Sequence, residues 1–203
     1  TDTAIINPGT NPNLNVTVQD VSCFGANDGM MITSATSGTT PYQFSSDGGA
    51  SFVPAGTPFG PTGQASYFIT VVDAEGCTDS DSVFVNEPDE LLISSLTVQN
   101  VLCYDSANGE LEAIVIGGTP GYAYTWTDAA TNVIAITDSI SNLIAGTYVV
   151  HVTDANGCQE TENTTVTTPS ELTTVMVENG TSCFGGSDGS ATVIVSGGTS
   201  PYS

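Results

Sequence analysis

Five cysteines are the residues of this sequence best suited to covalent chemistry. Cys23, Cys103 and Cys183 recur at a constant interval of 80 residues, and Cys77 and Cys158 lie between them. The close CxxC spacing that is typical of metal and redox sites does not occur. The cysteines therefore favour disulfide bonds and an oxidising compartment.

Two local motifs imitate enzyme sites. Residues 185–189 spell the G-x-S-x-G of a hydrolase nucleophile, but no strand-to-helix context follows, and the only histidine, His151, is expected on the outward face of a strand. The Gly-Gly-Thr turn at 117–119 imitates a phosphate-binding loop but lacks the lysine that such a loop needs. We therefore predict no catalytic residues.

Four aspartates at repeated turn positions are candidate ligands for calcium. Asp28, Asp73, Asp154 and Asp188 supply the carboxylate oxygens that hard cations prefer, in a chain without Lys or Arg. Aspartates at turns also accept backbone N–H bonds, which is the structural alternative. Asn108 replaces the first aspartate in the second copy of the pattern, and no EF-hand loop is present. Calcium is therefore a candidate cofactor beside a purely structural role.

The charge of the chain restricts its partners. The sequence has 22 acidic residues, no Lys or Arg, and a formal net charge of −22. Such a chain repels nucleic acid and anionic lipid. No apolar run is long enough to span a membrane, and Thr1–Leu14 lacks the basic region of a signal peptide. We expect no membrane insertion, and a leader, if any, to have been removed.

The elements that position these residues repeat along the chain. After each of the three regularly spaced cysteines, glycine, threonine and tyrosine recur in register. These columns are Gly29, Gly109 and Gly189; Gly38, Gly118 and Gly198; Thr39, Thr119 and Thr199; and Tyr42, Tyr122 and Tyr202. The period matches a small domain. We therefore expect a leading segment or the end of a preceding unit at 1–11, repeats at 12–88 and 89–169, and a truncated repeat at 170–203.

Alternating apolar residues predict β-strands and no helices. Tyr148, Val150 and Val152 share one strand face, and the Asp-Ala-x-Gly segments at 73–76 and 154–157 predict hairpin turns. The strand position of Trp126 predicts a core residue. About six or seven short strands per repeat describe a small sandwich. The predicted fold class is all-β, with tandem immunoglobulin-like β-sandwich repeats of about 80 residues arranged as beads on a string.

Three disulfide patterns are compatible with this repeat. The cysteines pair within a unit (Cys23 with Cys77, Cys103 with Cys158), across a junction (Cys77 with Cys103, Cys158 with Cys183), or from one unit to the next (Cys23 with Cys158). In a seven-strand sandwich the loop after the first strand and the turn before the last lie at opposite ends, which favours the third pattern. Small domains usually close their own loops, which favours the first. All three patterns stay open at this point.

Several segments resemble a known repeat family. They are Cys-Phe-Gly before Asp-Gly at 23–29 and 183–189, Gly-Gly-Thr before Pro and Tyr at 117–122, Ala-Gly-Thr-Tyr at 145–148, and Val-Thr-Asp-Ala-Asn-Gly-Cys at 152–158. Together they resemble the SprB-type repeat of gliding-bacteria adhesins, which is similar to PKD-like, immunoglobulin-like modules. The resemblance covers essentially the whole chain after residue 11, with loop departures at Ser37, 64–66 and 103–105. It implies an extracellular filament on a bacterial surface, exported by the type IX secretion system and used in adhesion or gliding.

The same resemblance adds a candidate modification that would make the chain a glycoprotein. The Asp-Ser/Thr-apolar O-glycosylation signal of gliding bacteria matches at Thr3, Ser82, Ser106 and Ser139. Short signals also match by chance, so an ordinary Ser/Thr-rich β surface is the alternative.

These observations predict a structural and adhesive repeat segment and not an enzyme. The expected partners are neighbouring repeats of the same chain and other copies in a fibre, with a surface or glycan ligand that the sequence does not identify. A calcium-rigidified spacer and a carbohydrate-binding module stay open as alternatives. The second of these needs an exposed aromatic platform, and Trp126 is the only tryptophan.

Overall fold

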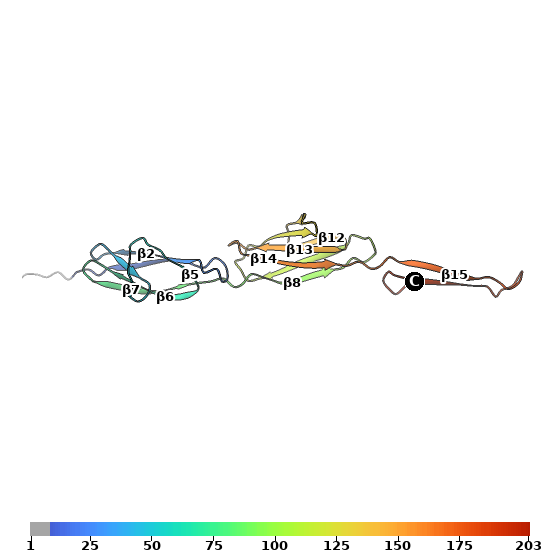
Figure 1. Cartoon of the computed structure of the whole chain (residues 1–203), viewed down its shortest axis with the longest axis horizontal. Coiled ribbons are helices and arrows are strands. Elements are labelled where there is room, and N and C mark those ends of the chain that lie inside the picture. Colours follow the sequence, from blue (N-terminus) through green and yellow to red (C-terminus); the bar gives the residue numbers. More distant parts are fainter. Residues whose placement is uncertain (1–8) are drawn as a thin grey trace, which may run out of the picture. The chain divides into compact units, whose positions relative to one another are not determined.

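The computed structural model describes residues 9–203, which form sixteen β-strands and no helix (Figure 1). The strands of the first repeat are β1 (Asn13–Gln19), β2 (Gly29–Thr36), β3 (Gln43–Ser45), β4 (Val53–Pro54), β5 (Phe59–Thr62), β6 (Ala65–Val72) and β7 (Thr78–Val85). Those of the second are β8 (Leu92–Gln99), β9 (Gly109–Ile116), β10 (Ala123–Asp128), β11 (Val133–Ala135), β12 (Ser139–Leu143), β13 (Gly146–Thr153) and β14 (Gln159–Val166). The third repeat has β15 (Thr173–Asn179) and β16 (Ser190–Ser196). The predicted all-β class is confirmed.

Each of the first two repeats is a sandwich of two antiparallel sheets. In the first repeat the sheets have the strand orders β1–β2–β5 and β4–β3–β6–β7, and in the second they have the orders β8–β9–β12 and β11–β10–β13–β14. A three-stranded sheet facing a four-stranded one, with the last two strands joined by a hairpin, is the immunoglobulin-like arrangement. The predicted tandem immunoglobulin-like repeats are therefore confirmed.

A tyrosine at the start of the sixth strand closes each sandwich in the same way. The hydroxyl of Tyr67 donates to the carbonyl of Gly63 at 3.1 Å, and that of Tyr148 donates to the carbonyl of Ile144 at 2.9 Å. This bond from a tyrosine to the backbone just upstream is the tyrosine corner of immunoglobulin-like domains. It ties the loop before the sixth strand to that strand in both repeats.

The core of each repeat lies between its two sheets. In the first repeat Val21, Met31, Ile69 and Val85 form a buried cluster. In the second repeat the buried cluster is larger and consists of Val101, Leu111, Ala113, Trp126, Ile140, Leu143, Tyr148, Val150, Val152 and Val166. Trp126 has no exposed surface, and its indole N–H donates to the carbonyl of Thr137 at 2.9 Å. The prediction of a core tryptophan is confirmed.

The first glycine column is explained by a close approach between the sheets. A Cβ atom on Gly29 would lie 2.7 Å from Cγ1 of Val85, and one on Gly109 would lie 2.7 Å from Cγ1 of Val166. Real Cβ atoms do not come so near another carbon. Only glycine lets the last strand of each repeat pack against the start of the second strand.

The turn after the second strand needs a left-handed backbone. Gly117 has φ 68° and Gly197 has φ 76°, and a Cβ atom on either would lie 1.9 Å from a backbone carbonyl oxygen. Ser37 occupies the equivalent place in the first repeat with φ 63°. A serine in this region is strained by about 1 kcal/mol, so the departure of the first repeat from the glycine pattern costs local stability.

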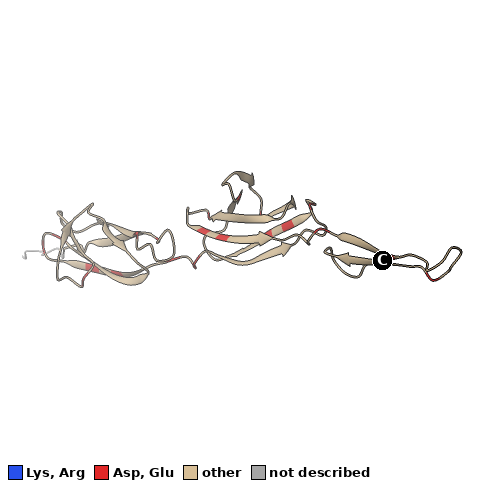
Figure 2. Cartoon of the chain, turned by 45° about the vertical axis from the view of Figure 1, so that its right-hand side comes forward, with Lys and Arg blue, Asp and Glu red and all other residues tan. Residues whose placement is uncertain are grey.

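Contacts divide the chain into two units. One contains the residues up to Leu91 together with 117–120 and 156–158, and the other contains the remaining residues up to Ser203. The acidic residues lie on strands and loops, and no Lys or Arg accompanies them (Figure 2). Among residues 9–203, no helix meets the length and hydropathy needed to cross a membrane.

Candidate functional site

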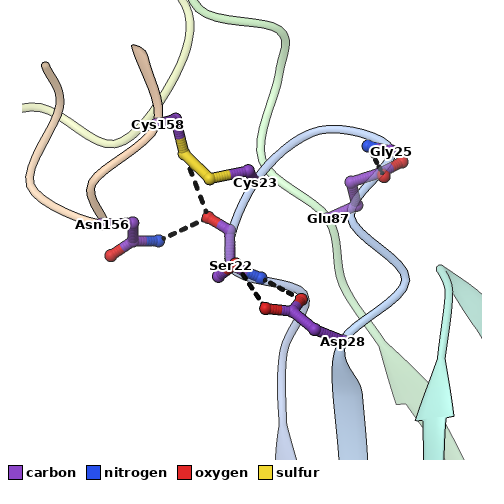
Figure 3. The surroundings of a disulfide bond; sticks show 7 residues. All are labelled: Ser22, Cys23, Gly25, Asp28, Glu87, Asn156 and Cys158. Atoms are coloured by element: carbon purple, nitrogen blue, oxygen red, sulfur yellow. Dashed lines mark hydrogen bonds between the residues drawn. A yellow bond between two sulfur atoms is a disulfide. The ribbon is translucent and has the colours of Figure 1, made fainter.

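The most distinctive chemical feature is a disulfide bond between two repeats of the sequence. Cys23, in the loop between β1 and β2, is bonded to Cys158, at the turn between β13 and β14 (Figure 3). The two Cα atoms are 5.7 Å apart, and the cysteines are separated by 135 residues of sequence. The contact grouping places both cysteines in the first unit. Of the three pairings that the sequence left open, the structure has the one from a repeat to the next.

Hydrogen bonds around the carbonyl of Ser22 hold the two cysteine segments together. The amide of Asn156 donates to this carbonyl at 2.9 Å, and the sulfur of Cys158 lies 3.5 Å from it (Figure 3). The N–H of Gly25 donates to the carboxylate of Glu87. The disulfide therefore lies in a hydrogen-bonded setting that fixes the loop and the turn.

Asp28 anchors the loop that carries Cys23. Its carboxylate accepts the N–H of Ser22 at 2.8 Å and also accepts the hydroxyl of the same residue. The hydroxyl bond first, and then the N–H bond, lower the pKa of Asp28 below the ordinary value of 3.8. The negative charge is thus stabilised by donors of the chain itself, and Asp28 is a loop anchor.

The other three cysteines, Cys77, Cys103 and Cys183, are free thiols. Of the five candidate disulfide cysteines the structure bonds only Cys23 and Cys158, and neither the pairing within a unit nor the one across the junction is formed. Cys77 is partly buried, and the other two are exposed.

The course of β1 explains why Cys23 does not pair with Cys77. The N–H of Leu14, at the start of β1, donates to Asp79 near the start of β7 at 2.9 Å. The N–H of Val21, just beyond β1, donates to the carbonyl of Asn86, just beyond β7, at 2.9 Å. Cys77 precedes β7 and Cys23 follows β1, so the length of a strand, about 20 Å, separates them. A disulfide needs Cα atoms within about 6.8 Å.

The candidate calcium ligands are engaged by the backbone. Asp73 is buried, and its carboxylate accepts the N–H groups of Thr39, Glu75 and Cys77 at 3.0, 3.0 and 2.8 Å. The bond from Thr39 is the largest cause of the lowered pKa of Asp73, and burial opposes it. Asp154 is buried at the equivalent turn.

Asp188, the fourth candidate, accepts the N–H of Ser182 at 3.1 Å. Within residues 9–203, no group of three or more His, Cys, Asp or Glu side chains is placed to hold a metal ion. The observed bonds are those of Asx turns and loop anchors, and calcium binding stays a prediction.

The candidate glycosylation residues differ in accessibility. Ser82 on β7 and Ser139 on β12 are exposed, and Ser106 in the loop after Cys103 is half-buried. Thr3 lies outside the described residues. A glycan could reach the first two side chains without unfolding, and the modification itself stays a prediction.

The serine of the hydrolase-like motif and the histidine lie on separate elements. Ser187 of the hydrolase-like motif is exposed in the loop between β15 and β16. His151 is exposed on β13, as predicted, and its Nδ1 lies 3.0 Å from the hydroxyl of Thr161 on β14. Trp126, the candidate for a carbohydrate platform, is fully buried. It therefore has no face on which a sugar could stack.

A shallow hollow lies on the three-stranded sheet of the second repeat. It has a volume of about 390 Å³, is largely open to solvent, and is lined by polar side chains that include Thr97, Glu110, Glu112 and Ser139. These are outward-facing strand residues, which gives the hollow the character of an exposed sheet surface.

Sequence reasoning found the cysteines but missed the residues that hold them. Asn156, Ser22 and Glu87 were not singled out, although each bonds near the disulfide. The sequence did contain one signal for these bonds. A residue with a side-chain oxygen recurs five residues after each of the three regularly spaced cysteines, at Asp28, Asn108 and Asp188.

Comparison with known proteins supports the resemblance seen in the sequence. The family model of the SprB repeat matches three times, at residues 15–51, 95–131 and 181–203. Three segments of the chain are therefore similar to the SprB repeat, and the predicted resemblance is confirmed. No curated protein matches the chain.

Two solved structures share a general similarity of fold. One is the crystal structure of a C-terminal 282-residue fragment of intimin in complex with the intimin-binding domain of the translocated intimin receptor. It has 12% identity and a TM-score of 0.34, and the match covers 85% of this chain and 67% of that one. The other is the amphioxus IgVJ-C2 molecule, with 14% identity, a TM-score of 0.31, and coverage of 80% and 99%. The repeat family itself identifies a repeat region of the surface-adhesin type, built from domains of a non-enzymatic kind.

Proposed function

We propose that this chain of SprB-like repeats is a structural segment of a long extracellular adhesin on a bacterial surface. In this role it spaces an adhesive part of the protein from the cell, and the protein is exported by the type IX secretion system. The observation that carries the proposal is the disulfide between Cys23 and Cys158, which ties one repeat covalently to the next.

The residues of the site support a mechanical role. Each of the first two repeats has its own core, and the disulfide adds a covalent connection that a monomeric enzyme or a lone binding domain does not need. Disulfides persist in oxidising surroundings such as a cell surface. The formal charge of −22 keeps such a chain soluble. No reaction is assigned to the chain, because its serine and histidine motifs belong to separate elements.

The location is tested on intact cells that produce the protein. Antibodies raised against the chain should label unpermeabilised cells, and protease added outside should remove the label. An antibody against a cytosolic protein is the matched control and should label only permeabilised cells. Labelling of the chain that requires permeabilisation would overturn the proposed location.

The structural role is tested by thermal unfolding of the chain with a reductant and with EDTA. Reduction should destabilise the protein, because loss of a disulfide costs about 2–5 kcal/mol. The variant Cys23→Ser should unfold like the reduced protein and should not respond further to reductant. EDTA should leave the melting temperature unchanged. A large decrease in EDTA would favour a calcium-rigidified spacer over a segment held by its disulfide.

A further inference from the structure

A small hollow, here named the loop hollow, lies beside the loop between β8 and β9 of the second repeat. Its volume is about 170 Å³, which is the room of about six water molecules and matches the size of one sugar ring. It is lined by Tyr104, Asp105, Ser106, Ile144, Ala145 and Thr168. These residues come from the loop itself, from the turn between β12 and β13, and from the segment after β14. The loop hollow therefore belongs to the second repeat alone.

The walls of the loop hollow combine apolar surface with oxygen atoms. Tyr104 and Ile144 supply apolar surface, and they are 54% and 61% exposed. Asp105 and Thr168 are exposed, Ser106 is half-buried, and each of the three has a side-chain oxygen. An aromatic ring beside a few hydrogen-bonding groups is the usual composition of a binding site for a small molecule.

Hydrogen bonds of the chain itself hold the loop side of the hollow. The carbonyl of Cys103 accepts the N–H of Ser106 at 3.2 Å and the hydroxyl of Thr168 at 3.3 Å. The N–H of Leu102 donates to the side-chain oxygen of Asn108 at 3.0 Å. The loop is therefore fixed both within itself and against the segment after β14.

The other walls are fixed as well. Ile144 is held by the tyrosine corner, because its carbonyl accepts the hydroxyl of the buried Tyr148 at 2.9 Å. Thr167 accepts the N–H of Val101 at 2.9 Å, and its own N–H donates to the side chain of Asn100 at 2.8 Å. A site whose walls are already ordered loses little conformational entropy when a ligand binds.

The loop residues of the hollow differ in one respect from their equivalents in the first repeat. Tyr104, Asp105 and Ser106 stand where the first repeat has Phe-Gly-Ala at 24–26. All three differences add a side-chain oxygen. The second repeat therefore has a set of hydrogen-bonding groups that the same loop of the first repeat lacks.

The facing walls differ too. Gly63 and Glu87 of the first repeat occupy the places of Ile144 and Thr168. The carboxylate of Glu87 accepts the N–H of Gly25, so it is engaged by the loop. The apolar wall and the hydroxyl are thus features of the second repeat and not of the shared fold.

Asp105 has a backbone conformation that suits glycine better. Its φ is 57°, and the equivalent residues Gly25 and Gly185 have φ 73° and 79°. An aspartate in this left-handed region is less stable than a glycine. Residues held in such conformations concentrate at ligand-binding sites. The carboxylate at 105 therefore reduces local stability, which indicates a role other than folding.

We propose that the loop hollow is a binding site for one residue of a neutral glycan. The ring of Tyr104 stacks on the apolar face of the sugar, and the carboxylate of Asp105 accepts hydrogen bonds from two neighbouring hydroxyls. The oxygens of Ser106 and Thr168 accept from further hydroxyls of the same ring. The proposal goes beyond the structural role proposed above and does not depend on it.

Charge selects this class of ligand. The chain has a formal net charge of −22 and no Lys or Arg that could pair with an anion, and Asp105 repels carboxylate and sulfate groups. In the part of the chain that the structure describes, no group of three or more His, Cys, Asp or Glu side chains could hold a metal ion. A neutral molecule with several hydroxyl donors is the ligand that these walls complement.

The test is saturation-transfer difference NMR of the chain with the methyl glycosides of glucose, galactose and mannose. Protein of unmodified mass is used, because a glycan attached to Ser106 would itself fill the hollow. Irradiation of the protein should transfer saturation to the ring protons of at least one glycoside, and titration should shift the resonances of Tyr104. Methyl glucuronide has a carboxylate on the same ring and should bind at least about 10-fold more weakly.

Three variants locate the binding. Asp105→Gly introduces the residue that the other two repeats have, so it should fold at least as stably as the wild type but bind about 10- to 100-fold more weakly, because hydrogen bonds to a charged group are lost. Tyr104→Ala should weaken binding by about 2- to 10-fold. Phe24→Ala removes the equivalent exposed aromatic residue of the first repeat. It is the matched control and should leave binding unchanged.

Several results would overturn the proposal. They are no transfer to any of the three glycosides, or wild-type binding by Asp105→Gly. Binding of the glucuronide as tight as that of the glucoside, or an equal loss in Phe24→Ala, would show unspecific contact with exposed rings and would overturn it too. All of these results leave the surface-labelling experiment untouched, so failure of the sugar site is distinguishable from failure of the proposed function.

Discussion

The first and second repeats have the same strand order but fill their sandwiches differently. Strand β10 of the second repeat has 6 residues and places Trp126 in the core. Strand β3 of the first repeat has 3 residues and ends at Ser45, whose hydroxyl donates to Asp47 at 2.7 Å. The strand order therefore depends on features that both repeats share, namely the close-packed glycine and the tyrosine corner. How well the core is filled depends on other residues, such as Trp126. The second repeat should therefore be the more stable of the two.

The largest effect is expected from removing the tryptophan. Trp126→Ala should destabilise the second repeat by about 3–5 kcal/mol, because it leaves a cavity in the core and an unpaired carbonyl at Thr137. Hydrogen exchange of peptides from β10 and β13 measures this loss. Peptides from β6 and β7 of the first repeat are the internal control.

In the wild-type chain, the stabilities of the first and second repeats can be compared directly. Trp126 is the only tryptophan, so its fluorescence reports unfolding of the second repeat alone, whereas circular dichroism reports all strands. With the disulfide reduced, the fluorescence transition should come at a higher denaturant concentration than the first part of the dichroism change. A fluorescence transition that precedes the dichroism change would reverse the order of stability given above.

Replacing the close-packed glycine by alanine should destabilise the first and second repeats by the same amount. Gly29→Ala and Gly109→Ala each force a Cβ atom against a core valine, so each should destabilise its repeat by about 1–3 kcal/mol. Gly180→Ala is the matched control, because nothing lies within 4 Å of the added Cβ atom there. Denaturant titration of the three variants gives the values. Unequal costs at the two glycines would show that the packing of the last strand differs between the repeats.

A smaller gain is expected in the first repeat. Thr33 is buried, and its hydroxyl is a buried polar group without a hydrogen-bond partner in the described structure, whereas Ala113 occupies the equivalent place in the second repeat. Thr33→Val exchanges the hydroxyl for a methyl group of similar shape and should stabilise the first repeat by about 1 kcal/mol. Thr33→Ser keeps the hydroxyl, removes the methyl group and should destabilise. Thermal unfolding compares the two variants with the wild type, and a loss of stability in the valine variant contradicts the assignment.

The smallest expected difference between the repeats is in how their stability depends on pH. The folded pKa of Asp28 lies below 3.8, so the bonds to Ser22 stabilise the first loop fully above that pH. This contribution is lost as the pH falls below 3.8 toward the folded pKa. Asn108 does not titrate, so the second loop has no such dependence.

Carboxylate NMR should give a midpoint below 3.8 for Asp28. The variant Asp28→Asn should flatten the acid limb of the stability curve. A midpoint above 3.8 would show that the bonds to Ser22 are absent in solution.

Strands and repeats were predictable because their signals are local. The alternation of Tyr148, Val150 and Val152 predicts a half-buried strand, and all three are buried. The Asp-Ala-x-Gly segments predict the turns that precede β7 and β14. Each signal depends on neighbouring residues, and neighbouring residues decide how a strand or turn forms.

The disulfide and its surroundings were less predictable because they depend on distance in space. Cys23 and Cys158 are separated by 135 residues, and repeat symmetry permitted three pairings of equal regularity. The choice depends on which end of a sandwich each loop reaches, and that follows only once the strand order is known. The bond from Asn156 to Ser22 depends on the same long-range arrangement and has no counterpart in local sequence.

The tyrosine column shows an intermediate case. Its periodicity was visible in the sequence, but its role was not. In the third repeat the hydroxyl of Tyr202 donates to the carbonyl of Gly197 at 2.6 Å, and Tyr42 makes the same bond to Ser37. These two tyrosines thus hold the left-handed turn after the second strand of their repeats, which alternation of apolar residues could not indicate.

If the chain is pulled from both ends, the disulfide limits how far it can extend, because it closes a loop of the chain. The tension passes through the sulfur atoms, so the chain between the two cysteines, whose sequence separation is 135, cannot lengthen the molecule even if its strands separate. Fully drawn out, that stretch would contribute about 450 Å. A reducing agent would therefore greatly increase the length to which the pulled chain can extend, although it changes few contacts in the chain at rest.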